Sequence, residues 1–169
     1  FASINWLSSY SGYTAMLEEW FKDNVASDML SLREKMLKIL HEENKLMDIV
    51  KLVGEDVLPD DQRVTLEIAK VIKVGFLQQN AYHEKDAYVE PQEQYSMLKV
   101  IEKLYDRAFS AVKRGIPLSK VKDEGLFREI IMMKYNVTGN EFFRGIEEKI
   151  DQYYDNLERV YKEGARNES

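Results

Sequence analysis

Asp61-Gln-Arg-Val-Thr-Leu-Glu-Ile-Ala-Lys-Val-Ile-Lys-Val-Gly-Phe-Leu-Gln78 is the stretch around which the rest of the chain is arranged. Its apolar residues recur at every third or fourth position, which is typical of an α-helix with one buried face. That face comprises Val64, Leu66, Ile68, Val71, Ile72 and Leu77. At about 1.5 Å per residue, the helix would be on the order of 27 Å long. Gly75 weakens it near its end. We therefore expect one long helix that joins two chemically different segments.

The segment at the carboxyl end of this helix combines amide and aromatic side chains: Phe76-Leu-Gln-Gln-Asn-Ala-Tyr-His-Glu-Lys-Asp-Ala-Tyr88. An amide such as that of Gln79 can hydrogen-bond the edge of a flat heterocycle, and the ring of Tyr82 or Tyr88 can stack on its face. The same pattern is typical of a helix end whose tyrosines fill the core. Taken without any other part of the chain, this segment favours the structural interpretation.

The segment at the amino end of the helix is an acidic loop, Gly54-Glu-Asp-Val-Leu-Pro-Asp-Asp-Gln-Arg63. Gly54 is a suitable end for the preceding helix, and Pro59 favours a turn. Asp60 or Asp61 can begin the following helix, because the helix dipole favours negative charge at its amino end. The sequence therefore predicts a helical hairpin with an acidic loop.

The remaining apolar patterns also have helical spacing. We expect helices over 14–24, 29–53, 91–115, 126–135 and from 142 onward, a linker over 116–118 and a frayed tail over 164–169. In the helix over 29–53, Glu42-Glu43-Asn44 interrupts an inward stripe that resumes with Leu46, Met47, Ile49, Val50 and Val53. The predicted fold class is all-α, a helical bundle. Its parts would be an extended entry segment over 1–13, a main bundle over 14–115 and a C-terminal helical extension over 116–169 packed on that bundle.

The length, net charge and residue composition of the chain limit the classes of function it can have. The chain has 169 residues, a net charge of -6 and no cysteine, which excludes disulfides and thiolate metal sites and argues against nucleic acid as the main partner. No apolar run is long enough to span a membrane, so no direct membrane insertion is expected. His41 and His83 lack the Glu-x-x-His spacing of a di-iron bundle, so we expect no metal site. No GxxxxGK[ST] sequence occurs, and we expect no catalytic residue for ATP hydrolysis.

FLQQNAYHEKDAY resembles the FLQQNAFHxxDxY segment of the catalytic A subunit of archaeal (A-type) and vacuolar-type rotary ATPases. Three further stretches resemble the same protein in the same order: FASINWLSSYS from Phe1, LVGEDVLPDDQRVTLEIAKVI, and YSMLKVIEKLYDRAFSAVKRGIPL from Tyr95. The resemblance covers essentially the whole chain and implies the C-terminal helical domain of the catalytic subunit. Because the first residue is Phe and not Met, we expect the chain to begin inside a longer polypeptide, after the nucleotide-binding domain.

The resemblance implies part of an adenine pocket. Tyr82 takes the position of the family's adenine-flanking aromatic residue, and Gln79 and Tyr88 would line the same pocket. Phe1 takes the position of a second aromatic residue, although Ala2 replaces the family's usual proline. ATP or ADP with magnesium is then expected in the full subunit, whereas no cofactor is expected for this chain alone. Stacking contributes roughly 1–3 kcal/mol, whereas millimolar affinity needs about 4 kcal/mol. The isolated chain is therefore expected neither to bind ATP saturably below millimolar concentrations nor to hydrolyse it.

The resemblance also implies a mechanical role for the acidic loop, which faces the central rotor shaft in the family. The expected rotor-contact residues are Glu55, Asp56, Val57, Leu58, Pro59, Asp60 and Asp61. Exposed ion pairs are each worth about 0–1 kcal/mol, so the acids would tune the contact and the apolar residues would transmit force. The implied partners are the chain's own nucleotide-binding domain, the B subunit and the central-shaft (rotor) subunit. These lie in a cytoplasmic, peripheral part of a membrane-bound complex. The alternative is a free-standing helical interaction module without a nucleotide role.

Overall fold

A computed structural model describes residues 28–78, 91–139 and 141–168 of the chain. These ranges contain helices and no strand, as the sequence predicts. The elements are α2 (Met29–Val53), the 3-10 helix η1 (Glu55–Val57), α3 (Asp60–Ile72), the π-helix η2 (Lys73–Gln78), α5 (Pro91–Lys113), α6 (Leu118–Val121), α7 (Glu124–Ile131), α8 (Met133–Asn136) and α9 (Phe142–Glu168). The entry segment predicted over 1–13 and the helix predicted over 14–24 lie outside the described residues.

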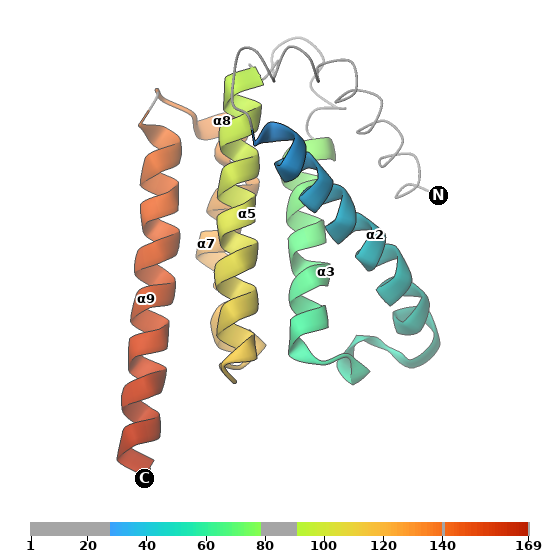
Figure 1. Ribbon diagram of the computed structural model, residues 1–169, viewed down its shortest axis with the longest axis vertical. Coiled ribbons are helices and arrows are strands. Elements are labelled where there is room, and N and C mark those ends of the chain that lie inside the picture. Colours follow the sequence, from blue (N-terminus) through green and yellow to red (C-terminus); the bar gives the residue numbers. More distant parts are fainter. Residues whose placement is uncertain (1–27, 79–90, 140, 169) are drawn as a thin grey trace.

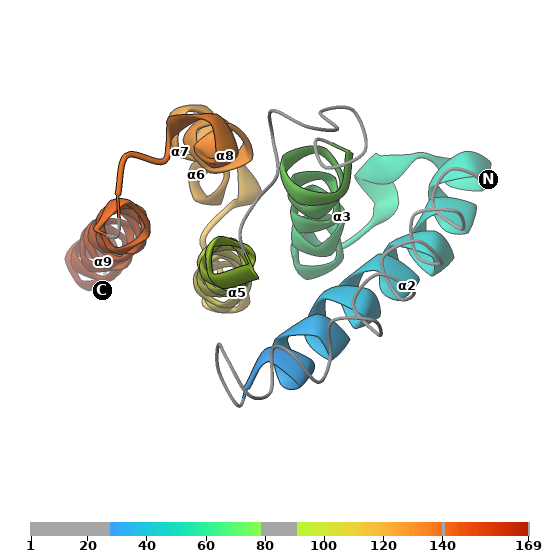
Figure 2. The ribbon, with the colours of Figure 1, turned by 90° about the horizontal axis from the view of Figure 1, so that it is seen from above.

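The bundle is built around α5, which lies between α3 and α9 and packs against both (Figure 1). α2 packs on α3 but crosses it obliquely (Figure 1). The short helices α6, α7 and α8 gather on one side of α5, as the view from above shows (Figure 2). One hydrophobic core runs through these elements from Met29 to Tyr154. It crosses the boundary predicted at residue 116, because Ile116 and Leu118 of the expected linker are both buried in it.

α2 is one uninterrupted helix of 25 residues, so the interruption expected at Glu42-Glu43-Asn44 is wrong. Glu43 lies three residues from both Leu40 and Leu46, so it shares their buried face. A carboxylate can occupy this position because Lys73 of η2 neutralises it, with Lys73 Nζ 2.6 Å from Glu43 Oε2. The stripe therefore continues through a charged residue.

The C-terminal part differs from the prediction at two places. The helix expected over 126–135 is divided into α7 and α8, which meet at Met132. α7 begins at a capped end, because the Asp123 carboxylate accepts a hydrogen bond from the Leu126 N–H at 2.9 Å. The expectation of a frayed tail is also wrong for most of its length, because α9 continues to Glu168.

α9 is fastened to α5 by a ladder of ion pairs. Asp151 lies 2.6 Å from Lys103 and 2.8 Å from Arg107, and Arg107 also lies 2.6 Å from Asp155. Burial alone would raise the pKa of Asp151, but hydrogen bonds and attraction from Lys103 and Arg107 outweigh burial and hold this pKa below its ordinary value. The ladder therefore favours the ionised carboxylate and sets the register of α9 along α5.

Candidate functional site

The hairpin between α2 and α3 has the turn that the sequence predicts. Gly54 has φ of 90°, a backbone conformation that suits glycine, and its N–H donates to the Val50 carbonyl at 2.8 Å. The Leu58 N–H then donates to the Glu55 carbonyl at 3.0 Å and closes η1. Pro59 precedes α3, which begins at Asp60. The predicted loop and the predicted helix start are both confirmed.

Leu58 anchors the hairpin loop from inside. It is only 6% exposed and packs with Leu46 of α2 and Leu66 of α3 in a small second core, with Val50 beside them. The sequence places Leu58 among the residues that face a partner, whereas the structure turns its side chain inward. The physical reason is that Leu46 and Leu66 offer this apolar side chain a place away from water, between the two helices of the hairpin. Leu58 therefore supports the loop, and its neighbours present the surface.

Two acids of the loop bind the rest of the bundle. The Asp60 carboxylate accepts a hydrogen bond from the Leu118 N–H at 3.1 Å. The Asp61 carboxylate lies 3.0 Å from Lys113 Nζ at the end of α5. The sequence-based expectation is that both carboxylates act on a partner, but these contacts hold the start of α3 against α5 and α6. The hairpin is thereby fixed to the bundle at the end where α5 finishes.

The other two acids of the loop are more open. Glu55 lies 3.9 Å from Arg63, a distance at which the attraction through solvent is weak. Asp56 is exposed and forms no ion pair within the described part of the chain. These carboxylates are the ones that remain available to tune a contact.

The tip of the hairpin presents apolar side chains to solvent. Leu52 is 84% exposed, Val53 and Val57 are each 59% exposed, and Ile49 is 43% exposed. Ile49, Leu52 and Val53 share one face of α2, since they are three and four residues apart. We call Ile49, Leu52, Val53 and Val57 the apolar tip. The inward stripe expected through Met47, Ile49 and Val53 is wrong, because the oblique crossing carries the last turns of α2 away from α3 (Figure 1).

The helix after the loop reaches Gln78 as predicted, but its hydrogen-bonding pattern changes on the way. α3 ends at Ile72, and Lys73–Gln78 continues as the π-helix η2. The hairpin loop and η2 lie at opposite ends of α3 (Figure 1). Gln79, Tyr82, Tyr88 and Phe1, the predicted adenine-pocket residues, lie outside the described residues.

η2 packs closely on its surroundings. Phe76 is buried in the main core. A Cβ added to Gly75 would lie 3.2 Å from the Ile131 Cα, tighter than an ordinary carbon contact. The sequence predicts Gly75 as a weak point of the helix, and the structure shows a packing reason for it. The absence of a side chain lets η2 approach the backbone of α7.

The sequence-family model described as the C-terminal domain of V and A type ATP synthase matches residues 18–122 of the chain. This match covers more than half of the chain and includes the hairpin, α3 and η2. The chain belongs to this family. The resemblance that the sequence motifs indicate is therefore confirmed.

Individual relatives match nearly the whole chain. The V-type ATP synthase alpha chain 2 of Clostridium tetani is 56% identical over 164 residues, which cover 96% of this chain and 28% of the relative. The V-type ATP synthase alpha chain of Halothermothrix orenii is 46% identical, with the same coverage of both chains. The A subunit of the A-type ATP synthase of Methanopyrus kandleri is 40% identical over 93% of this chain and 27% of the relative. The chain spans little more than a quarter of these relatives, and they include bacterial as well as archaeal proteins.

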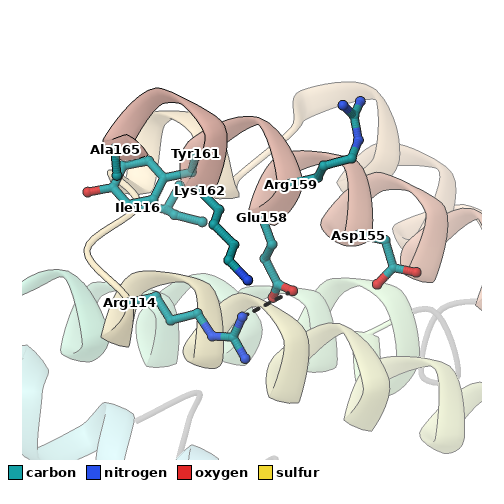
Figure 3. Close-up of a pocket in the computed structure, with 8 residues that line it drawn as sticks. All are labelled: Arg114, Ile116, Asp155, Glu158, Arg159, Tyr161, Lys162 and Ala165. Atoms are coloured by element: carbon teal, nitrogen blue, oxygen red, sulfur yellow. Dashed lines mark ion pairs between the residues drawn. The ribbon is translucent and has the colours of Figure 1, made fainter. Parts of the chain in front are cut away.

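The domain also has a hollow that the sequence does not reveal. It has a volume of about 600 Å³ and lies between the end of α5 and the carboxyl half of α9 (Figure 3). Its lining is Arg114, Ile116, Asp155, Glu158, Arg159, Tyr161, Lys162 and Ala165. Glu158 pairs with Arg114 at 3.5 Å and with Arg107 at 3.6 Å, so its charge is already used to hold the two helices together. Residues brought together by the packing of separate helices leave no local sequence pattern.

The side chains and helices of the domain limit its chemistry. Within the described ranges, no three His, Cys, Asp or Glu side chains gather closely enough to hold a metal ion. None of the described helices has the length and apolar character that crossing a membrane requires. The described part of the domain offers packing and contact surfaces, and its most exposed apolar surface is at the hairpin.

Proposed function

We propose that this chain acts as the C-terminal domain of the catalytic A subunit of a rotary ATP synthase or ATPase. In the full subunit it completes the adenine side of a nucleotide site and passes the nucleotide state to the rotor through the hairpin. Tyr82 flanks the adenine, with Gln79, Tyr88 and Phe1 around it, and ATP or ADP with magnesium is held mainly by another part of the protein. The family match and the order of the resembling segments support this assignment.

The partners in this proposal are the chain's own nucleotide-binding domain, the B subunit of the complex and its central-shaft (rotor) subunit. The chain is then a cytoplasmic, peripheral part of a membrane-bound complex that moves hydrogen ions. The relatives are named as ATP synthase chains, which supports a place inside such a complex.

The observation that carries the mechanical part is the exposure of the apolar tip. Burying one Val, Leu or Ile side chain contributes about 1.5–3 kcal/mol, whereas an exposed ion pair contributes about 0–1 kcal/mol. Leu52 and its neighbours therefore outweigh Glu55 and Asp56 as a source of affinity for the rotor. Leu58, Asp60 and Asp61 hold the tip in place from behind.

A force on the tip has a direct path into the domain. α2 and α3 join through the short loop that Leu58 fills, and Asp61 ties the start of α3 to Lys113 of α5. The hairpin therefore moves together with α3 and α5. Such a stiff connection would transmit displacements from the opposite end of α3 to the hairpin and so to the rotor.

The test replaces the apolar tip in the assembled complex, which contains the full catalytic chain, the shaft and the B subunit. Leu52→Ser with Val53→Ser should weaken shaft binding at least about tenfold, because two apolar side chains no longer become buried. Ion transport per ATP hydrolysed should fall with it. Binding of the shaft and the ratio of transport to hydrolysis are the measurements.

Val160→Ser is the matched control, since Val160 is a similarly exposed valine (52%) on α9, at the far side of the bundle from α2. It should leave both measurements unchanged. Equal effects from the tip and the control, or no effect from the tip, would contradict the mechanical role. The free-standing interaction module would then be favoured.

A further inference from the structure

The π-helix η2 is an unusual way to continue α3. In a π-helix each N–H bonds to the carbonyl five residues back, so the turn holds one residue more than an α-helical path. Such turns are rare and occur frequently at functional sites. η2 is six residues long and ends directly before Gln79, which the proposed function assigns to the adenine pocket. Two contacts with other helices lie at its start and its middle.

One contact is the buried ion pair between α2 and η2. Glu43 Oε2 lies 2.6 Å from Lys73 Nζ, and the Glu43 side chain is only 5% exposed. Lys73 is the first residue of η2, so this ion pair joins α2 to the point at which the wide turn begins. Glu43 comes from α2, the helix whose last turns carry the apolar tip.

The other contact is the close approach of Gly75 to Ile131 at the end of α7. A Cβ at this position would lie 3.2 Å from the Ile131 Cα, so the close approach of η2 to α7 depends on the missing side chain of Gly75. Lys73 and Gly75 thus hold η2 from two sides, through α2 and through α7.

We infer that Glu43, Lys73 and Gly75 are positioning residues for the nucleotide site. They fix the register in which the chain leaves α3. Glu43 lies on α2, so its ion pair with Lys73 also joins η2 to the helix that carries most of the apolar tip. A slip of one residue along a helix turns the following side chains by about 100° and moves them by about 1.5 Å. Adenine contacts that follow Gln78 would not survive such a slip. This inference rests on the proposed function and adds a second route from the hairpin, through α2.

The test compares two buried ion pairs in the assembled complex. Glu43→Gln keeps the shape of the side chain and removes its charge. We expect it to raise the KM for ATP about 10- to 100-fold, the scale of a displacement of roughly 1 Å at a binding site, with kcat changed less than about twofold. Combining Glu43→Lys with Lys73→Glu should restore at least part of the affinity by forming the pair in reverse.

Glu67→Gln is the matched control. Glu67 is also buried and lies 2.8 Å from Lys122 Nζ, but this pair joins α3 to the residue after α6 and does not reach η2. Both variants should lower the Tm, and only Glu43→Gln should change KM. A Glu43→Gln variant with lowered Tm and unchanged KM would overturn the inference, as would an equal KM change in Glu67→Gln.

A third variant separates this inference from the proposed function. Tyr82→Ala should raise the KM for ATP about 5- to 150-fold, the range that corresponds to loss of one stacking contact. If Tyr82→Ala raises KM and Glu43→Gln does not, the positioning role fails and the adenine pocket stands. If Tyr82→Ala also leaves KM unchanged, the pocket itself fails, and the positioning role fails with it.

Discussion

Tyr154 holds the short helix α6 against α9 through one buried hydroxyl group. Its ring is fully buried, and its O–H donates to the Val121 carbonyl at 2.7 Å. Burial disfavours the phenolate, so the pKa of Tyr154 lies well above its ordinary value. Because the folded state holds this proton more tightly than the unfolded chain, the contribution is complete below the ordinary tyrosine pKa of about 10. It is lost as the pH rises toward the pKa of the folded state.

Tyr154→Phe should therefore lower the free energy of unfolding at neutral pH by about 1–2 kcal/mol, because the Val121 carbonyl loses its donor. Above about pH 10 the loss of stability with rising pH should be shallower in the variant than in the natural chain. Denaturant unfolding at pH 7 and at several alkaline values measures both effects. Tyr161→Phe, an exposed tyrosine on the same helix, should change the neutral value by less than about 0.5 kcal/mol.

Sequence-based prediction succeeds where a residue acts on its neighbours and fails where it acts across the fold. Gly54 and Pro59 have the predicted turn roles because glycine and proline act through their own backbone. Glu43 looks like a break in an apolar stripe, since its partner Lys73 is thirty positions away. Leu58 is predicted to face outward because nothing in the loop sequence shows that it packs with Leu46 and Leu66 of the two helices.

Helical periodicity predicts the elements well, although it cannot give their hydrogen-bonding pattern. The helices expected over 29–53, 61–78, 91–115 and from 142 all lie near their observed ranges. The change from α to π at Lys73 coincides with contacts to α2 and α7, which the local sequence does not contain. The same is true of the last turns of α2, whose apolar residues follow the pattern of a buried face while the crossing angle exposes them.

A comparison of two helical glycines tests the packing of η2. Gly75 lies against the Ile131 backbone, whereas a Cβ on Gly145 of α9 would meet nothing within 4 Å. Alanine is favoured over glycine within a helix by about 1 kcal/mol. Gly145→Ala should raise the free energy of unfolding by this amount. Gly75→Ala should show no such gain, because its new Cβ would lie too close to the Ile131 backbone. Thermal unfolding should show Gly145→Ala as the more stable variant by at least about 1 kcal/mol. Equal stability of the two variants would mean that η2 has room to move.

At the scale of the whole molecule, one main core holds the helices together, and a small second core lies at the hairpin. The hairpin is at the end where α5 finishes, and η2 is at the other end of α3 (Figure 1). The position of the acidic loop at one end of α3 agrees with the sequence-based expectation. The adenine residues themselves stay a prediction, because they lie outside the described ranges. The chain also spans little more than a quarter of its relatives, and in the proposed function the phosphate groups are held by another part of the protein.

The isolated chain should show no saturable ATP binding below millimolar concentrations. Stacking of the adenine contributes roughly 1–3 kcal/mol, whereas millimolar affinity needs about 4 kcal/mol. Calorimetric titration with ATP and magnesium measures this directly. Micromolar affinity would contradict the prediction and would mean that this domain holds the phosphate groups by itself.

The uncovered leucine and valines at the hairpin also have a consequence before assembly. A newly made protein displays them to everything else in the cell until its partners arrive, and exposed apolar groups of this kind promote aggregation. Polar replacements chosen to improve yield or solubility would remove the same side chains that contact the shaft in the proposed function. Solubility of the free protein and shaft contact in the proposed function therefore place opposite demands on Leu52, Val53 and Val57.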